Sequence, residues 1–298
     1  MTANVLDRRN FVRACALLLA ARTDFRFAPR PAPQDALRIG FIAGNTGSAA
    51  ARGVTLGVEE AARTGELVGR RIELVTVDSV DSAAAHFREG GPVAALVGGF
   101  SDSWCRGPST ISSVVDTVFM NVGCRADALR GEACGRNVFH VEASARMYAD
   151  ALAARGGGSA DAANAVLWHP SLERFGAAQL NDRFRARFGA EMDDAAWAGW
   201  MAVKVLWEAS LRARTVEAAG LRAWLERDST QFDGHKGWPL SFRAWDHQLR
   251  QPLYLVAADG ARVVAEVPER RAEEGSAREL LDRLGADAAA STCRMDAD

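Results

Sequence analysis

Short loops rich in glycine, serine and threonine are the parts of this sequence best suited to bind a small molecule. Four polar loops follow apolar stretches that are expected to be strands, and they span residues 44–48, 78–82, 101–105 and 123–127. The carboxyl ends of parallel strands meet at one edge of a sheet, so these loops should lie close together. In the first loop (GNTGS), backbone N–H groups and hydroxyls at a helix start can hold an anion, most naturally a carboxylate. Thr46 and Ser48 are equally well explained as helix caps.

Catalysis is the second kind of chemistry to consider. Ser101 or Cys124 could act as a nucleophile if a histidine such as His140 lay beside it. However, residues 99–103 (GFSDS) lack the second glycine of the Gly-x-Ser-x-Gly motif, and the loop at 44–48 lacks the glycine spacing of nucleotide sites. The histidines are scattered and there is no Cys-x-x-Cys pair, so no metal site is expected. We therefore expect a protein that is not an enzyme and has no cofactor, with a small Ser/Cys hydrolase as the weakest alternative.

Composition and charge are those of an ordinary globular protein. Of 298 residues, 48% are apolar and 25% are charged, and 36 Lys+Arg against 38 Asp+Glu leave a net charge of -2. This balance provides no basic field, so nucleic acid is not an expected partner. The longest apolar run is Ala14–Ala21, whereas a helix needs about twenty apolar residues to cross a bilayer.

The first residues have the layout of an export signal. A basic segment with paired arginines, Asp7–Arg13, precedes the short apolar run, and a proline-rich stretch follows at 29–33. This layout predicts a periplasmic protein exported by a twin-arginine-like or a general signal. The alternative is a disordered leader that stays in the cytoplasm. Four cysteines follow the leader, so three full pairings are open; they are Cys105, Cys124, Cys134 and Cys293.

Apolar runs alternate with helical patterns after the leader, which predicts an α/β fold with a parallel sheet. The first half should hold strands at 37–43, 71–77, 93–98, 117–122 and 137–141, with helices at 50–63, 83–89 and 109–115. A helix at 143–155 then ends in Gly156–Gly158, the strongest linker signal of the chain.

The second half is expected to be mainly helical. We expect a strand at 165–168, helices at 170–189, 195–214 and 218–227, a strand at 239–243, a hairpin of 252–258 with 261–267, and a helix at 276–284. In the second of these helices, Trp197, Trp200 and Trp207 form an aromatic stripe with Lys204. Such a stripe usually faces the core while the lysine ammonium reaches solvent, and a ligand-facing Lys204 is the minority interpretation.

Several of these segments also resemble a known family. LRIGFIAGNTGSAAARGVTLGVEEA, RRIELVTVDS, AALVGGFSD and VFMNVGC resemble the first lobe of type I periplasmic binding proteins of the branched-chain amino acid class. Residues 168–254 are similar to a subfamily of ABC-transporter substrate-binding proteins associated with alcohol oxidation by pyrroloquinoline-quinone dehydrogenases. DALRGEAC near Cys134 and the terminal STCR at Cys293 also fit that subfamily.

The resemblance implies two α/β lobes with parallel sheets and a solute held between them. It divides the chain into a leader and linker (1–35), lobe 1 (36–142 and 195–251), a reduced lobe 2 (143–194 and 252–267) and a C-terminal helix and tail (268–298). It places seven residues in the ligand loops of lobe 1: Asn45, Thr46, Ser101, Asp102, Ser103, Cys124 and Arg125. It also implies a disulfide between Cys134 and Cys293, which leaves Cys105 and Cys124 as a second pair or as free thiols.

Lobe 2 departs from the family pattern because it is short. About twenty-five residues separate Ser144 from Trp168, whereas each strand-helix-strand unit needs roughly thirty or more. The remaining strands should leave an apolar face exposed, which favours a homodimer or a partner protein.

We therefore expect a periplasmic substrate-binding component of an ABC transporter that holds a small carboxylate-bearing solute. Its partners would be the solute, the permease and a periplasmic quinoprotein dehydrogenase, with pyrroloquinoline quinone as a ligand rather than a cofactor. The alternative is an interaction protein that kept this scaffold and lost the solute.

Overall fold

The computed structural model describes residues 34–43, 48–99, 110, 113, 116–154, 162–270 and 275–295. Residues 35–298 form one unit, which is the part considered below. The expected export signal, the linker at Gly156–Gly158 and most of the helix expected at 109–115 lie outside the described residues. Among the residues that are described, no helix is both long and apolar enough to cross a membrane.

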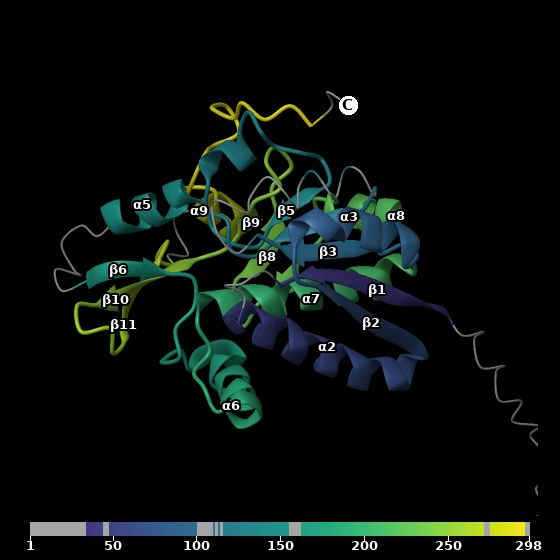
Figure 1. The fold of residues 1–298 in the computed structure, drawn as a ribbon. Helices are drawn as coiled ribbons and strands as arrows, with labels where there is room; N and C mark the ends of the chain where they lie inside the picture. The colour runs from purple at the N-terminus through teal and green to yellow at the C-terminus, as the bar shows by residue number, and fades with distance from the viewer. Residues whose placement is uncertain are drawn as a thin grey trace, which may run out of the picture. The chain divides into compact units, whose positions relative to one another are not determined.

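A five-stranded sheet in the order β2-β1-β3-β4-β5 is the framework of the molecule (Figure 1). Its strands are β1 (Gln34–Ile42), β2 (Arg70–Val77), β3 (Ala95–Gly98), β4 (Val118–Asn121) and β5 (Val138–His140). β1 pairs in parallel with β3, β3 with β4, and β4 with β5. Every residue of β3, β4 and β5 is buried, as expected for apolar strands that are covered on both faces. The α/β class predicted from the sequence is confirmed.

Helices cover both faces of this sheet because side chains along each strand alternate between the faces. α2 (Ser48–Val68), α7 (Asp194–Ala213) and α8 (Ala218–Leu225) share one apolar core with β1, β3 and β4. α3 (Val80–Glu89) packs on the other face, where Phe87 meets Leu96 and Phe119.

α2 and α7 approach each other closely because each presents a glycine to the other. A Cβ atom added at Gly53 would lie 1.9 Å from the carbonyl oxygen of Ala196, and one added at Gly199 would lie 2.5 Å from that of Ala50. The tryptophans of α7 are buried, as predicted for the aromatic stripe.

The second sheet is small and antiparallel. Its order is β11-β10-β6, formed by β6 (Ala162–Val166), β10 (Leu253–Ala257) and β11 (Val263–Val267), and β10 runs against both neighbours. α5 (Ala145–Ala153) packs against β6 and β10. The hairpin expected at 252–258 and 261–267 is confirmed. The parallel second sheet that the resemblance implies is not found among these strands, because the chain between α5 and β6 is too short for the strand-helix units that would add parallel strands.

The apolar face expected on this second sheet is not exposed. All of β10 is buried and β11 is at least half-buried. Among the described residues, only three large apolar side chains are exposed, and they are Leu67, Val68 and Phe175, none of which belongs to a strand of this sheet.

Backbone conformation explains where two elements differ from their predicted bounds. The helix expected at 170–189 is a short 3-10 turn, η3 (Arg174–Gly176), followed by α6 (Ala177–Phe188). Phe175 and Gly176 have φ values of 58° and 88°, so a right-handed helix cannot start before Ala177. Near the C-terminus, α9 (Ala277–Leu281) begins after Ser276, whose side chain and Glu279 cap the helix reciprocally.

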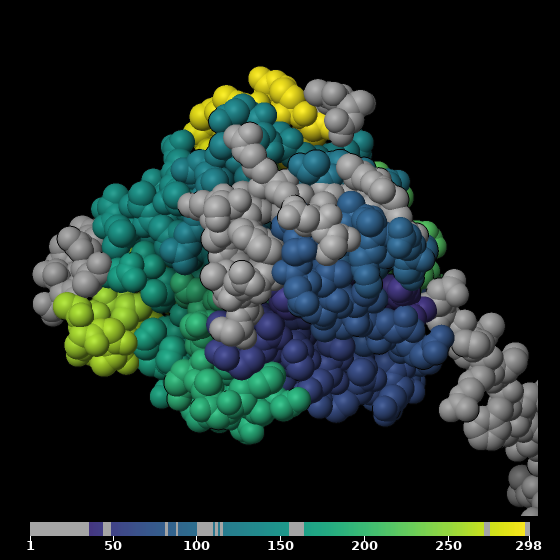
Figure 2. Space-filling view, in the orientation of Figure 1, coloured from purple at the N-terminus to yellow at the C-terminus, as the bar shows by residue number. Residues whose placement is uncertain are grey.

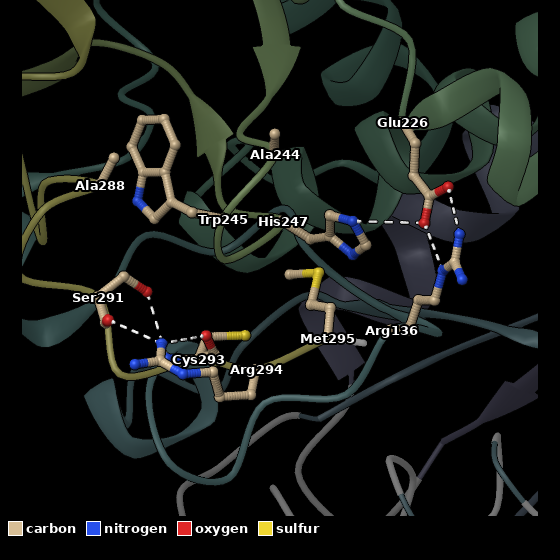
Figure 3. A pocket seen from close by; sticks show the side chains of 10 residues that line it. All are labelled: Arg136, Glu226, Ala244, Trp245, His247, Ala288, Ser291, Cys293, Arg294 and Met295. Atoms are coloured by element: carbon tan, nitrogen blue, oxygen red, sulfur yellow. Dashed lines mark hydrogen bonds and ion pairs between the residues drawn. The ribbon is translucent and has the colours of Figure 1, made fainter. Parts of the chain in front are cut away.

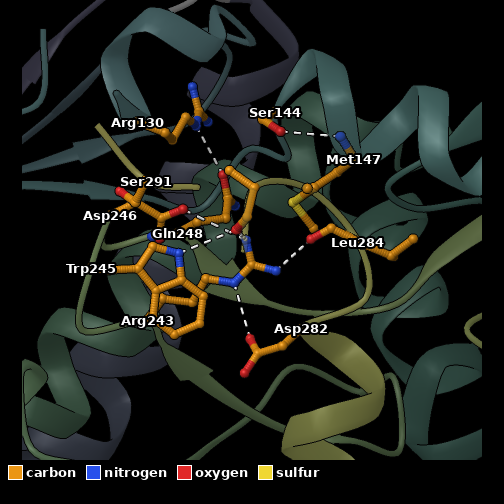
Figure 4. A network of polar contacts seen from close by, with 12 residues as sticks. Arg130, Ser144, Met147, Arg243, Trp245, Asp246, Gln248, Asp282, Leu284 and Ser291 are labelled. Atoms are coloured by element: carbon orange, nitrogen blue, oxygen red, sulfur yellow. Dashed lines mark hydrogen bonds and ion pairs between the residues drawn. The ribbon is translucent and has the colours of Figure 1, made fainter. Parts of the chain in front are cut away.

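A third, antiparallel sheet and a set of buried arginines hold the C-terminal segment. The sheet contains β7 (Phe232–Asp233), β8 (Pro239–Phe242) and β9 (Leu249–Arg250). Arg243, just after β8, is 1% exposed; it donates to the Asp282 carboxylate at 3.1 Å and contacts the Leu284 carbonyl (Figure 4). Beyond α9, Cys293 forms a disulfide with Cys134.

Replacing Gly53 by alanine should destabilise the protein even though alanine is the better helix former. The added methyl group would overlap the Ala196 carbonyl, so the two helices must separate at a cost of about 1–3 kcal/mol in the free energy of unfolding. Urea denaturation measures this change. Gly220→Ala in α8 is the control, because its nearest contact is a Thr215 methyl group that can rotate away. If Gly53→Ala lowered the free energy of unfolding no more than Gly220→Ala does, the close approach of α2 and α7 would be contradicted.

Replacing Cys134 and Cys293 together by serine should also lower stability. The disulfide joins residues 159 positions apart, and removing it frees a long loop in the unfolded chain, which costs about 2–5 kcal/mol. The urea midpoints of the wild type and of the double serine variant measure this difference in stability. An unchanged midpoint would mean that the arginine contacts alone hold the tail.

Candidate functional site

Cys124 and Arg125, two of the residues that the family resemblance places in the ligand loops, lie in the loop after β4. The other five lie outside the described residues; they are Asn45, Thr46, Ser101, Asp102 and Ser103. Asn121, at the end of β4, shapes the loop: its side-chain oxygen accepts from the Cys124 N–H at 2.8 Å and its amide donates to the Cys124 carbonyl at 2.8 Å. This tight turn buries Cys124 and leaves the side chain of Arg125 44% exposed.

Cys124 in this loop cannot act as a nucleophile. Cys124 is disulfide-bonded, so it has no free thiol. Nδ1 of His140 lies 2.9 Å from the Asn121 amide nitrogen and Nε2 lies 3.1 Å from the Leu129 carbonyl. The amide donates and the carbonyl accepts, so both ring nitrogens of this neutral imidazole are used. Burial also lowers the pKa of His140 well below its usual value, and His140 is not available as a base for Cys124.

A partly buried charged cluster consists of Arg125, Glu142, Tyr148 and Asp194, with Glu142 and Tyr148 buried and Arg125 facing solvent. Glu142 follows β5, Tyr148 lies in α5 and Asp194 begins α7. The Glu142 Oε1 atom accepts from the Tyr148 hydroxyl at 2.7 Å and lies 3.3 Å from Arg125 Nε. Arg125 Nη2 is 3.4 Å from Asp194 Oδ2, and the guanidinium lies over the Tyr148 ring at 4.1 Å. Three neighbours thus fix the orientation of this guanidinium.

Asp194 connects the charged cluster to the second sheet. Its Oδ1 atom accepts from the backbone N–H groups of Leu167 and Trp168, both at 2.8 Å, and these residues directly follow β6. The preceding residue, Asp193, caps α7 by accepting from the Ala196 N–H at 2.9 Å. The two adjacent aspartates therefore have different roles: Asp193 caps the N-terminus of α7, and Asp194 joins the helix to the sheet.

Lys236 lies beside this cluster, and sequence reasoning missed it. It is 1% exposed, and its Nζ atom donates to Gln251 Oε1 at 3.0 Å and to the Pro252 carbonyl at 3.2 Å. The ammonium also lies 4.0 Å from the Trp197 ring and 5.5 Å from the Tyr254 ring. The available signal was a lysine between two glycines (GHKG) in a chain that has only one other lysine.

The other lysine, Lys204, has the ordinary role expected for it. It is half-buried on α7 and pairs with Glu208 one turn later. This contact agrees with a lysine whose stem packs on the helix.

Burial changes the protonation of these groups. Desolvation, followed by the charge of Glu142, raises the pKa of Asp194 to about 7. Desolvation also raises the pKa of Glu142 and lowers that of Lys236 to about 7. For Arg125, burial works to lower the pKa, but Glu142, Tyr148 and Asp194 raise it overall. Arg125 is therefore the fixed charge of the cluster, while Asp194 and the nearby Lys236 change protonation near neutral pH.

Replacing Asp194 by asparagine should remove a pH dependence of stability between about pH 4 and 7. The pKa of Asp194 is 3.8 in the unfolded chain and about 7 in the folded one, so the folded state holds an extra proton in this window. The free energy of unfolding therefore falls as the pH rises through it. Asparagine keeps an oxygen for the Leu167 and Trp168 N–H groups but does not titrate.

Urea denaturation of both proteins across this window tests the expectation. The contribution of Lys236, whose pKa falls from 10.5 to about 7, changes above the window and rises with pH there. Parallel curves for the two proteins below pH 7 would show that Asp194 does not titrate as expected.

Comparison with known proteins matches this chain to binding proteins. Residues 147–262 match a family model described as periplasmic binding protein, a family of solute-binding proteins and not of enzymes. The search of curated proteins found no match to this chain. Among the described residues, no three side chains of metal-binding type are grouped to hold an ion.

Several solved structures share the fold at low identity. A periplasmic binding protein from Burkholderia mallei is 14% identical with a TM-score of 0.69, and the match covers 88% of this chain and 99% of that one. A leucine-, isoleucine-, valine-, threonine- and alanine-binding protein from Brucella ovis in a closed conformation is 12% identical with a TM-score of 0.66, covering 88% and 99%. The branched-chain amino acid transporter substrate-binding protein of Streptococcus pneumoniae, in complex with isoleucine, is 14% identical with a TM-score of 0.61, covering 78% and 98%. The chain therefore has the α/β fold of the type I periplasmic binding proteins, and its residues 147–262 carry the sequence pattern of that family.

Proposed function

We propose that this protein is the substrate-binding component of an ABC uptake system and holds a small carboxylate-bearing solute without transforming it. The fold supports this function, since the solved structures that share it include transporter substrate-binding proteins. Under this proposal the partners are the solute and the permease that receives it.

The position of Arg125 carries the proposal. It follows β4 at the carboxyl edge of the parallel sheet, which is where open α/β sheets bind ligands. Glu142, Tyr148 and Asp194 hold its guanidinium in one orientation, yet the side chain is 44% exposed. A guanidinium that is already oriented loses little freedom when it binds a carboxylate. Asn45, Thr46 and Ser101–Ser103 would complete the site from the neighbouring loops, whereas the side chain of Cys124 is buried and would not contact the solute.

An extracytoplasmic location goes with this function. The bond between Cys134 and Cys293, and the disulfide that includes Cys124, would persist in an oxidising compartment such as the periplasm. The basic and apolar leader supports the same location, whichever export route it uses.

A finer proposal concerns the identity of the solute. Residues 168–254 resemble substrate-binding proteins associated with quinoprotein alcohol oxidation, so pyrroloquinoline quinone and alcohol-derived acids join the branched-chain amino acids as candidates. Pyrroloquinoline quinone carries carboxylates and would bind here as a solute rather than as a cofactor.

A second candidate function follows from the size of the second sheet. Three strands provide little surface to close over a solute. The protein could instead use this scaffold to bind the permease, a periplasmic dehydrogenase or a second copy of itself.

Calorimetric titration of the full chain with pyrroloquinoline quinone, short aliphatic acids, aromatic acids and branched-chain amino acids separates the two candidates. We expect one compound to bind saturably and Arg125→Ala to weaken it at least about tenfold, because a charged hydrogen-bond partner is lost. Arg125→Lys should also bind more weakly, since lysine lacks the planar guanidinium.

Arg183→Ala is the matched control. Arg183 is exposed to a similar extent and pairs with Glu60 on another surface, so its loss should leave binding unchanged. Circular dichroism melts confirm that each variant is folded. If no compound binds the wild type, or if both arginine variants bind equally well, the solute-binding proposal is wrong and the interaction protein is favoured.

A further inference from the structure

A cavity lies at the edge of the first sheet opposite to Arg125. It has a volume of about 640 Å³ and is lined by side chains from the start of β5, the end of α8, the β8–β9 turn and the C-terminal tail (Figure 3). The side chains that matter here are Arg136, Glu226, Trp245, His247 and Arg294. Arg136 precedes β5 whereas Arg125 follows β4, so in a parallel sheet the two sites lie at opposite ends of the strands.

His247 presents an unused lone pair to this cavity. Its side chain is 2% exposed, its φ is 49°, and its ring stacks on Phe139 with centroids 4.1 Å apart. Nδ1 lies 3.1 Å from the Val138 carbonyl, which can only accept, so the proton of the neutral ring sits on Nδ1. Nε2 is then an acceptor, and among the described residues no group donates to it.

Glu226 places a second acceptor beside the first. Its Oε1 atom is 3.7 Å from His247 Nε2, and Arg136 binds the carboxylate from the other side with Nε at 3.2 Å and Nη2 at 3.4 Å (Figure 3). Burial, helped by Arg136 and Arg222, lowers the pKa of His247 to about 4 despite Glu226, so the ring is neutral at pH 7. Two acceptors that face each other with no donor between them are unfavourable. A ligand with two donors placed between His247 Nε2 and Glu226 would satisfy both.

Charge disfavours a cation throughout the cavity and an anion at the acceptor pair. Arg136, Arg222 and Arg294 disfavour a cation here, and the Glu226 carboxylate together with the His247 lone pair disfavours an anion. A neutral molecule with hydroxyl groups fits, because a hydroxyl both donates and accepts. Two adjacent hydroxyls could donate to the two acceptors, and a third could accept from Arg294, which lines the cavity.

We propose that this cavity binds a neutral polyhydroxylated molecule, a sugar or polyol, through a pair of adjacent hydroxyls donated to His247 Nε2 and Glu226. Trp245 provides an apolar wall for the carbon skeleton. Its indole is held in place by a hydrogen bond to the Ala286 carbonyl at 3.2 Å and by the guanidinium groups of Arg243 and Arg250 at 5.3 and 5.2 Å.

Calorimetric titration of the full chain with myo-inositol and D-glucose tests this site, with 1-propanol and acetamide as comparison compounds. The two polyols should bind saturably at one site, while 1-propanol, which has one hydroxyl, should not. Glu226→Gln should weaken binding at least about tenfold, because the new amide can donate to His247 Nε2 and occupy the acceptor pair. Arg294→Ala, on the exposed rim, should weaken it by a smaller factor.

Glu59→Gln is the matched control. Glu59 takes the same two-pronged contact from Arg187 on a different surface, so polyol binding should be unchanged. Nitrogen NMR of the His247 ring gives an independent readout: polyol should shift Nε2 and leave the protonated Nδ1 in place.

Three results would overturn the proposal. The first is an absence of polyol binding, and the second is equal binding of polyol by wild type and Glu226→Gln. The third is an imidazole that carries protons on both nitrogens at pH 7, since it would then be ion-paired with Glu226 and would offer no acceptor. Preferential binding of acetamide would show that the site takes an amide rather than a polyol.

Discussion

The Asp194 carboxylate is the contact on which the arrangement of the two sheets depends. One oxygen holds the chain just after β6 through two backbone N–H groups, and the other meets Arg125 after β4. Because Asp194 is also the first residue of α7, a single side chain joins the first sheet, the second sheet and a long helix of the shared core. No apolar contact could do the same, since backbone N–H groups buried here need an acceptor.

The small second sheet makes such contacts necessary. Three strands and one helix bury little apolar surface on their own, and isolated small sheets are marginally stable. Stability must come from the first sheet and its helices. The Gln251 amide donates to the Val141 carbonyl at 2.7 Å, and Lys236 donates to the Pro252 carbonyl at 3.2 Å, so the segments that connect the sheets are also fixed by buried polar contacts.

The sequence predicts the first sheet well and the charged cluster poorly, for a physical reason. β1, β3 and β4 are runs of apolar residues whose pattern depends only on neighbours along the chain, and their bounds came out within a few residues. Glu142 and Asp194 are ordinary surface types in sequence, and their contacts with Arg125 join residues that are 17 and 69 positions apart. Arg125 was implicated by family position, yet nothing local indicated that two carboxylates hold it.

Opening along the boundary between the sheets would break the contacts that hold the molecule together. Separation would strip Asp194 from the Leu167 and Trp168 N–H groups and Lys236 from the Pro252 carbonyl. Each buried polar group left without a partner costs about 1–3 kcal/mol, and more where it is charged. A solute that binds near Arg125 must therefore reach a site whose two sides are already joined. Under the proposed function, affinity at this edge would therefore depend on groups that existing contacts already orient, as they do Arg125, more than on closure of one sheet over the other.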